Sequence, residues 1–304
     1  MIHISNLKDG LPYFKALSSD VRINILELLT KHNQLNMQDI ANELNLTSGT
    51  ITMHIKKLTD CGLIEVSTLP GKQGIQKMCY LPKDKIIVDI GNETSENTYE
   101  SEISVGHYSA YKATPTCGLA TKERLIGEVD DSRYFADPER INAGIIWLTA
   151  GFLEYHIPNY LKADESFEEL QITMELSSEA PGICNNWPSN IYFSINGVNV
   201  GFWVSPGDFG TTKGILTPSW WFPNWNQHGL LKLLSINSFG TFIDGLKISD
   251  TTLADLNLNY RSEIILRIEV PEDSEHVGGL TLFGRDFGNY GQGIHTRIIY
   301  HKQN

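Results

Sequence analysis

The sequence predicts an α+β chain of two domains, a mainly helical domain with a β-hairpin over residues 1–84 and an all-β sandwich over residues 85–304. Two observations support this prediction. Apolar residues recur at helical spacing in the first part, whereas short alternating runs separated by Gly, Pro, Asn and Asp fill the rest. The 304 residues also suffice for about two domains that each bury a core.

Net charge separates the two parts of the chain. Hydrophobic residues make up 41% and charged residues 20%, as in globular proteins, and no apolar run approaches the ~20 residues of a membrane-spanning helix. The net charge is −12, yet residues 1–90 hold ten Lys and Arg against nine Asp and Glu. Contact with nucleic acid is therefore expected only in the first part, and no membrane contact is expected.

The N-terminus and the cysteines indicate a cytoplasmic protein. Residues 1–10 lack the basic start and apolar run of a secretory signal. The four cysteines form no Cys-x-x-Cys pair and have no His at zinc-finger spacing. We therefore expect reduced thiols, no metal site and no cofactor.

Three helices are predicted in the first domain. Residues 19–31 carry apolar side chains at helical spacing, residues 37–44 follow the capping residue Asn36, and residues 48–61 follow Thr47. In the third helix the apolar stripe lies opposite a face of short polar or cationic side chains, which can approach base edges and phosphates. That face comprises Ser48, Gly49, Thr50, Thr52, Met53, Lys56 and Lys57.

A β-hairpin is predicted after the third helix. Gly62 ends the helix, and strands over residues 63–68 and 76–81 flank a turn at residues 70–74. Helices followed by such a hairpin form a winged helix-turn-helix. The third helix would enter the major groove, while Lys72, Gln73 and Lys77 reach the backbone or minor groove beside it.

The segments "FKALSSDVRINILELL", "MQDIANELNLTSGTITMHIKKLTDCGLIEV" and "GKQGIQKMCYL" resemble the winged-helix domain of ArsR-type bacterial regulators over about residues 10–85. The resemblance implies binding of a dimer to double-stranded operator DNA, with bases contacted by Ser48, Thr50, Thr52 and Met53, and with His54 and Lys56 near the backbone. Metal-sensing members carry a cysteine pair in the helix that here reads "NMQDIANEL", so metal sensing there is not expected. The predicted DNA contacts are Thr47, Ser48, Gly49, Thr50, Thr52, Met53, His54, Lys56, Lys57, Lys72, Gln73 and Lys77.

Ten strands and one short helix are predicted in the second domain. Asn196-Gly197 is a two-residue hairpin signal, and the spacing suggests a jelly-roll or galactose-binding-like sandwich. The helix is expected at residues 251–257. The strands are expected at residues 85–90, 99–105, 144–157, 169–176, 190–195, 198–204, 230–236, 263–270, 279–283 and 294–300.

Tryptophans and amides suggest a ligand site in the second domain. All six tryptophans lie there, and five fall between residues 187 and 225 among Asn, Asp and Gln. Aromatic faces can cover a sugar ring while amides and carboxylates bond its hydroxyls, although the same tryptophans can instead fill the core. We predict a site for a small polar ligand, for example a carbohydrate, formed by Trp187, Trp203, Trp220, Trp221, Trp225, Asn186 and Asp208.

The segments "NNWPSNIYFSINGV", "WVSPGDFG", "LTPSWW" and "GGLTLFGRDFGNYGQGI" resemble the C-terminal domains of certain ArsR-type regulators of Gram-positive bacteria. The resemblance supports a regulator and indicates no particular effector. We predict a homodimeric regulator whose sandwich senses a ligand. An alternative is that the sandwich only mediates oligomerisation.

An enzyme fused to the helical domain is a further alternative, and no enzymatic activity is predicted. The loop carboxylates of residues 128–139 and the Cys117 thiol near His107 are the residues that would favour it. Thr116, Cys117 and Arg140 could instead line the ligand site. Loops 205–209 and 285–289 supply oxygens that suit a structural calcium ion, but no EF-hand spacing is present.

Overall fold

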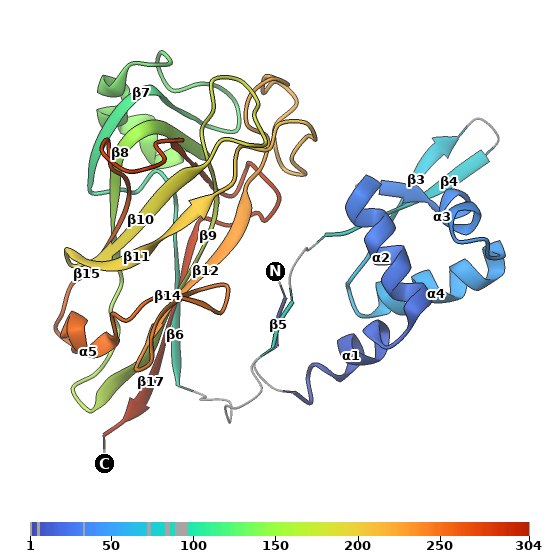
Figure 1. Cartoon of the computed structure of the whole chain (residues 1–304), viewed down its shortest axis with the longest axis horizontal. Coiled ribbons are helices and arrows are strands. Elements are labelled where there is room, and N and C mark those ends of the chain that lie inside the picture. The colour runs from blue at the N-terminus through green and yellow to red at the C-terminus, as the bar shows by residue number, and fades with distance from the viewer. Residues whose placement is uncertain are drawn as a thin grey trace. The chain divides into compact units, whose positions relative to one another are not determined.

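The computed structural model describes residues 2–4, 7–32, 34–71, 74–82, 86–88 and 97–303. The chain divides into two compact units, Met1–Thr94 and Ser95–Asn304, called here the N-terminal unit and the β unit (Figure 1). The boundary predicted between residues 84 and 85 falls outside the described residues. A mainly helical first part followed by a large all-β part confirms the predicted fold class.

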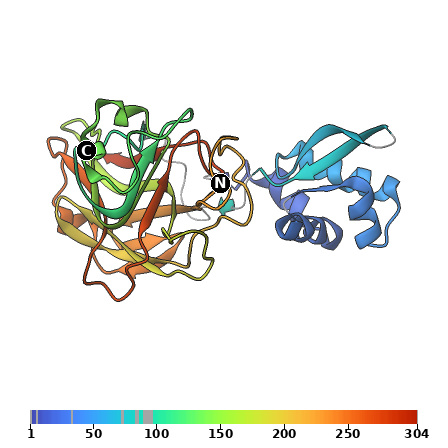
Figure 2. The same ribbon diagram turned by 90° about the horizontal axis from the view of Figure 1, so that it is seen from above.

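The N-terminal unit contains the three predicted helices and the hairpin. Strands β2, β4 and β3 form one antiparallel sheet in that order, and β1 pairs with β5 in parallel. In Figure 2 the cyan hairpin β3–β4 lies along one side of the blue helices. The elements are β1 (Ile2–Ile4), α1 (Leu11–Leu17), α2 (Asp20–His32), β2 (Gln34–Asn36), α3 (Met37–Glu43), α4 (Ser48–Asp60), β3 (Glu65–Gly71), β4 (Gly74–Tyr80) and β5 (Ile86–Val88).

Local sequence signals set the ends of these helices. The Asn36 side chain accepts hydrogen bonds from the backbone N–H groups of Gln38 and Asp39 at the start of α3. Gly62 follows α4 with a φ of +75°, a conformation that glycine adopts without strain. The run over residues 85–90, predicted as a strand of the sandwich, contains β5 and pairs with β1 of the N-terminal unit.

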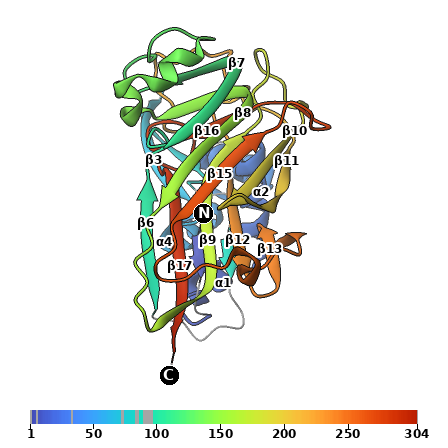
Figure 3. The ribbon, with the colours of Figure 1, turned by 90° about the vertical axis from the view of Figure 1, so that its left-hand side faces the viewer.

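The β unit is one antiparallel sheet of 12 strands among the described residues, wrapped around a large core, and a second, smaller buried cluster contains Trp147 and Trp221. Figure 3 shows β6, β17, β9 and β12 side by side, and β16 joins β9 to β8. The strands are β6 (Thr98–Ile103), β7 (Ala110–Ala120), β8 (Ile145–Ile157), β9 (Glu165–Ser177), β10 (Ser189–Ile195), β11 (Val198–Ser205), β12 (Leu230–Asn237), β13 (Gly240–Ile243), β14 (Leu246–Ser249), β15 (Ile264–Val270), β16 (Leu280–Phe283) and β17 (Ile294–Lys302).

The other nine strands predicted for the second domain coincide with strands of the β unit, and Asn196-Gly197 turns the hairpin β10–β11. The predicted short helix is α5 (Leu253–Leu256). Strands β7, β13 and β14 were not predicted. Short 3-10 helices at Ser132–Ala136 and Pro138–Asn142 connect β7 to β8.

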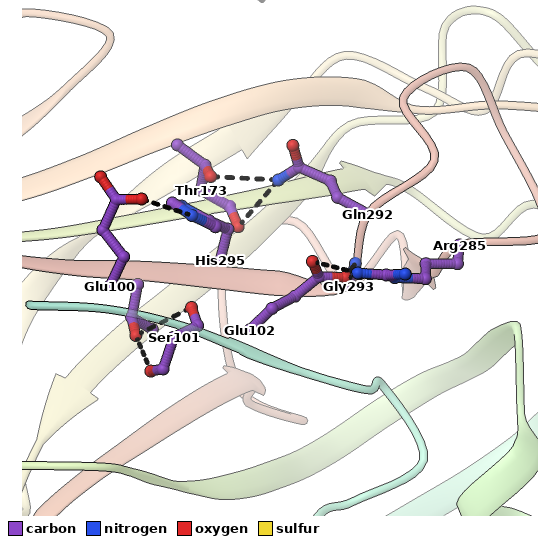
Figure 4. Close-up of polar contacts among 9 residues, drawn as sticks. Glu100, Ser101, Glu102, Thr173, Arg285, Gln292, Gly293 and His295 are labelled. Atoms are coloured by element: carbon purple, nitrogen blue, oxygen red, sulfur yellow. Dashed lines mark hydrogen bonds and ion pairs between the residues drawn. The ribbon is translucent and has the colours of Figure 1, made fainter.

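A polar network fastens the edge strand β6 to the sheet (Figure 4). The Glu102 carboxylate accepts hydrogen bonds from Arg285 Nε and Arg285 Nη2, both at 2.7 Å, and from the Gly293 backbone N–H at 2.9 Å. Next to it, the hydroxyls of Ser101 and Thr296 lie 2.6 Å apart across the β6–β17 pair. The Arg285 guanidinium holds the pKa of Glu102 below its ordinary value.

None of the helices built from described residues is long and apolar enough to cross a membrane.

Candidate nucleic-acid interface and ligand cavity

Helix α4 is positioned by a buried apolar stripe and a capped start. Ile51, Ile55 and Leu58 are at most 1% exposed and pack in the core of the N-terminal unit. The Thr47 hydroxyl accepts a hydrogen bond from the Thr50 backbone N–H, as the sequence suggested. Burial of one face fixes the helix rotation, so the residues between the stripe positions point outward.

The structure places most of the predicted DNA-contacting residues of α4 on its exposed face. Met53 is 51% exposed although its side chain is apolar. Thr50 and His54 are half-buried, and Lys77 is exposed on β4. Lys72 and Gln73, predicted for the hairpin turn, lie outside the described residues. The exposed residues of this face are Thr47, Ser48, Gly49, Thr52, Met53, Lys56 and Lys57.

Hydroxyl groups at the start of α4 bond to neighbouring groups of the same unit. Ser48 Oγ donates to Gln38 Oε1 at 2.9 Å, which links α4 to α3. Thr52 Oγ1 donates to the Ser48 carbonyl at 2.8 Å, and the hydroxyls of Thr47 and Thr50 lie 2.9 Å apart. These contacts order the exposed face and show that Gln38 lies against it, which the sequence did not indicate.

His54 is half-buried, unlike the exposed residues of α4 beside it. Its Nδ1 atom is buried without a hydrogen-bond partner among the described residues. Burial lowers the pKa of His54, and the nearby charges of Arg22 and Lys57 lower it further. The Arg22 guanidinium is itself fixed by the carbonyls of Ala16 and Lys15 at the end of α1. The neutral imidazole is therefore the favoured form at neutral pH.

The winged helix-turn-helix DNA-binding family model matches residues 18–65, which span α2, α3 and α4. An HTH-type transcriptional regulator of Methanocaldococcus jannaschii is 34% identical over 89 residues, covering 29% of this chain and 90% of that protein. The chain belongs to the winged helix-turn-helix family. A second protein of the same organism is 39% identical over 51 residues, covering 17% of this chain and 55% of its own length. The predicted DNA-binding domain is thereby confirmed.

Two solved structures are similar to parts of the chain at low identity. A CBM36-1 domain of a multidomain xylanase from the hindgut metagenome of Trinervitermes trinervoides is 10% identical, with a TM-score of 0.28, covering 66% of this chain and 96% of its own. Dimeric latent PorU from Porphyromonas gingivalis is 12% identical, with a TM-score of 0.29, covering 79% of this chain and 18% of its own. Similarity this low carries no functional argument.

In the β unit, the predicted ligand residues do not form one site. Trp221 and Trp225 line a cavity, and Trp220 packs edge-on against Trp221. Trp203 instead lies beneath the Lys232 ammonium, 4.4 Å from its ring centre. Trp187, Trp203, Asn186 and Asp208 are not among the residues that line the cavity.

Asp208 has a structural position. It is fully buried, and its carboxylate accepts hydrogen bonds from the backbone N–H groups of Cys184 at 2.7 Å and Ala180 at 3.4 Å. Burial raises its pKa. Glu175, 1% exposed, likewise accepts the N–H groups of Gly229 at 2.8 Å and Asn289 at 3.0 Å. Both side chains therefore hold loops in place, and Asp208 does so at Ala180, which lines the cavity.

The cavity has a volume of about 190 Å³. Its wall combines Trp147, Trp221 and Trp225 with the carboxyl groups of Glu179 and Asp130. Trp147 and Glu179 were not predicted as site residues, and Asp130 was noted only among loop carboxylates. Thr116, proposed from the sequence as a lining residue, does line it, whereas Cys117 and Arg140 do not.

Two alternatives weighed from the sequence, nucleophilic chemistry at Cys117 and a bound metal ion, gain no support from the described residues. Burial raises the pKa of the Cys117 thiol to about 11, with smaller contributions from Asp130 and Asp131, so the thiol is protonated at neutral pH. Arg140 Nη1 is bonded to the carbonyls of Gly106 and Tyr108. No cluster of three or more His, Cys, Asp or Glu in the described ranges is arranged to hold a metal ion.

Proposed function

We propose that the protein is a cytoplasmic, homodimeric transcriptional regulator of the ArsR type, not an enzyme, that binds operator DNA through α4 and the β3–β4 hairpin. The ordered, exposed face of α4 carries the proposal, because it presents polar and cationic groups on a buried, capped helix. The charge distribution agrees, since residues 91–304 hold 14 Lys and Arg against 27 Asp and Glu and would be repelled by phosphates.

We further propose that the β unit binds a small polar ligand that changes the affinity for DNA. The cavity with aromatic and carboxyl groups supports this part of the proposal. In a dimer, two recognition helices must lie about one DNA turn apart, roughly 34 Å, so a ligand can act by changing their spacing. The alternative, a β unit that only mediates oligomerisation, requires no saturable binding of any small molecule.

Selection of bound sequences from fragmented genomic DNA tests the DNA-binding part. The full-length protein should retain a two-fold-symmetric site at low and at moderate salt. Lys56→Ala should weaken binding to that site and lower the slope of log affinity against log salt by about one, because one phosphate contact is lost. Lys162→Ala removes the same charge from an exposed position of the β unit and serves as the control. Unchanged affinity and slope in Lys56→Ala would contradict the assignment of α4.

A further inference from the structure

We infer that the tryptophan-lined cavity of the β unit binds an uncharged, hydroxyl-rich ring of about the size of one monosaccharide. The class of ligand is inferred from the cavity itself, whereas a role of that ligand in regulation rests on the proposed function. The volume of about 190 Å³ lies below the ~300–1,000 Å³ typical of sites for drug-sized molecules. The cavity therefore suits a single small ring.

Three tryptophans form a rigid aromatic wall. Trp147 and Trp221 are each 6% exposed, and their rings meet edge to face with centres 5.8 Å apart. Trp225 packs against both, with ring centres 5.7 and 5.0 Å away. Each ring fixes the next, so the wall is formed before any ligand binds. A preformed aromatic surface can cover the apolar face of a sugar ring with little loss of side-chain entropy.

The indole N–H group of one wall tryptophan is bonded within the protein. Trp221 Nε1 donates to the Asn226 carbonyl at 2.9 Å. Trp147 and Trp225 line the cavity together with Trp221, and Trp147 is more than nine-tenths buried. Trp221 therefore contributes its ring, and not its N–H group, to the cavity wall.

The acidic side of the cavity is held by a chain of hydrogen bonds. Asn226 Nδ2 donates to Thr281 Oγ1 at 3.2 Å, and Thr281 Oγ1 donates to Glu179 Oε2 at 2.6 Å. Asn226 also bonds Ser178 and Phe209, so it positions the other groups and has little capacity left for a ligand. Asp130, which also lines the cavity, accepts the Cys117 N–H through Oδ1 at 3.0 Å.

The charge of the lining selects the ligand. No Lys, Arg or His is among the residues that line the cavity, so an anionic ligand would face two carboxyl groups without a cationic partner. Burial raises the pKa of Glu179 to about 8, which keeps the carboxyl group protonated at neutral pH. A protonated carboxyl group both donates and accepts hydrogen bonds, as does each hydroxyl of a sugar. The lining therefore matches a neutral polyol better than a cation, which needs acceptors only.

Tryptophan fluorescence of the full-length protein tests the inference. The probes are D-glucose, D-galactose, D-mannose and D-xylose, with D-glucuronate and D-glucosamine as charged analogues. At least one neutral sugar should give a saturable change in the millimolar range or below, and the charged analogues should bind at least tenfold more weakly. The change should persist in Trp187→Phe, because Trp187 is outside the cavity.

Variants of Glu179 test whether its side chain binds the ligand as a neutral hydrogen-bonding group. Glu179→Gln keeps a neutral group that donates and accepts, so affinity for the neutral sugar should stay within about threefold, whereas Glu179→Ala should lower it by about tenfold or more. No saturable change with any neutral sugar, or stronger binding of a charged analogue, would overturn the inference. Specific DNA binding is measured on the same preparation, so that failure of the ligand inference and failure of the proposed function can be distinguished. Specific DNA binding without binding of any sugar refutes only the ligand inference. Sugar binding without specific DNA binding refutes only the proposed function.

Discussion

The stability of the β unit should depend on pH through Glu179, and Glu179→Gln should remove that dependence. Burial raises the pKa of this carboxyl group from 4.5 to about 8, and the nearby charges of Asp208 and Asp130 act in the same direction. The Thr281 hydroxyl, which bonds the carboxylate, opposes the shift. Folding therefore favours the protonated form. The resulting stability is fully present below pH 4.5 and is lost as the pH rises toward and through 8.

The size of the effect follows from the two pKa values. Integrating proton linkage for a group with a pKa of 4.5 unfolded and about 8 folded gives a loss of roughly 3 kcal/mol of unfolding free energy between pH 6 and pH 9. Because the side chain is partly exposed to solvent, this figure is an upper value. Glutamine cannot ionise and can still accept from Thr281, so the variant should match the wild type at pH 6 and exceed it at pH 9.

Urea unfolding of the full-length protein, followed by tryptophan fluorescence, measures this difference. All six tryptophans lie in the β unit, so the signal reports the unfolding of that unit alone. Glu275→Gln removes an exposed carboxylate of the same unit and is the matched control. Parallel stability curves for Glu179→Gln and the wild type between pH 6 and 9 would refute the proposal that Glu179 is protonated in the folded protein at neutral pH.

Two further substitutions test the surroundings of the cavity and the attachment of β6. Gly118→Ala should destabilise the β unit by about 1–3 kcal/mol and change the fluorescence of the folded protein, because an added Cβ would overlap the Trp147 ring; a wild-type emission spectrum would contradict this. Glu102→Gln should lower the unfolding free energy by about 1 kcal/mol at pH 7, because the charged bonds to Arg285 are lost. The folded pKa of Glu102 is lowered, so its stabilisation is present above pH 4.5 and is lost in acid; in urea titrations the difference between Glu102→Gln and wild type should shrink toward pH 3.

Strong local patterns made most of the fold predictable. The runs that became β8, β9, β12 and β15 are rich in Ile and Leu and are long enough to be recognised alone. Strand β7 was missed because Pro115, Gly118 and several small residues interrupt its pattern, and its pairing with β8 continues past a bulge between Thr114 and Cys117. The hairpin β13–β14 carried a usable signal, since Asp244-Gly245 is a favoured two-residue turn.

The two candidate sites were not equally predictable. The exposed face of α4 could be predicted because apolar residues recur at helical spacing within its 13 residues, and the polar residues between them must point outward. The cavity joins Trp147 on β8, Glu179 after β9 and Trp221 in a distant loop. Trp147 lies in a long apolar strand, where nothing distinguishes a wall residue from a core residue. Long-range pairing through β16, which brings β8 and β9 together, determines this site.

The effects of the ligand and the operator on each other's binding affinity distinguish a sensor from a β unit that only binds a sugar or only mediates oligomerisation. If a ligand in the cavity changes the affinity of α4 for its operator by a given factor, the operator must change the affinity of the cavity for the ligand by the same factor. The tryptophans report the cavity and none lies in the N-terminal unit, so the same fluorescence titration can be repeated on the DNA complex. Equal sugar affinities with and without operator would mean that the cavity exerts no control over DNA binding. A matched change in both affinities would require two states of the protein that each ligand distinguishes, and its size would be the coupling free energy that the regulator uses.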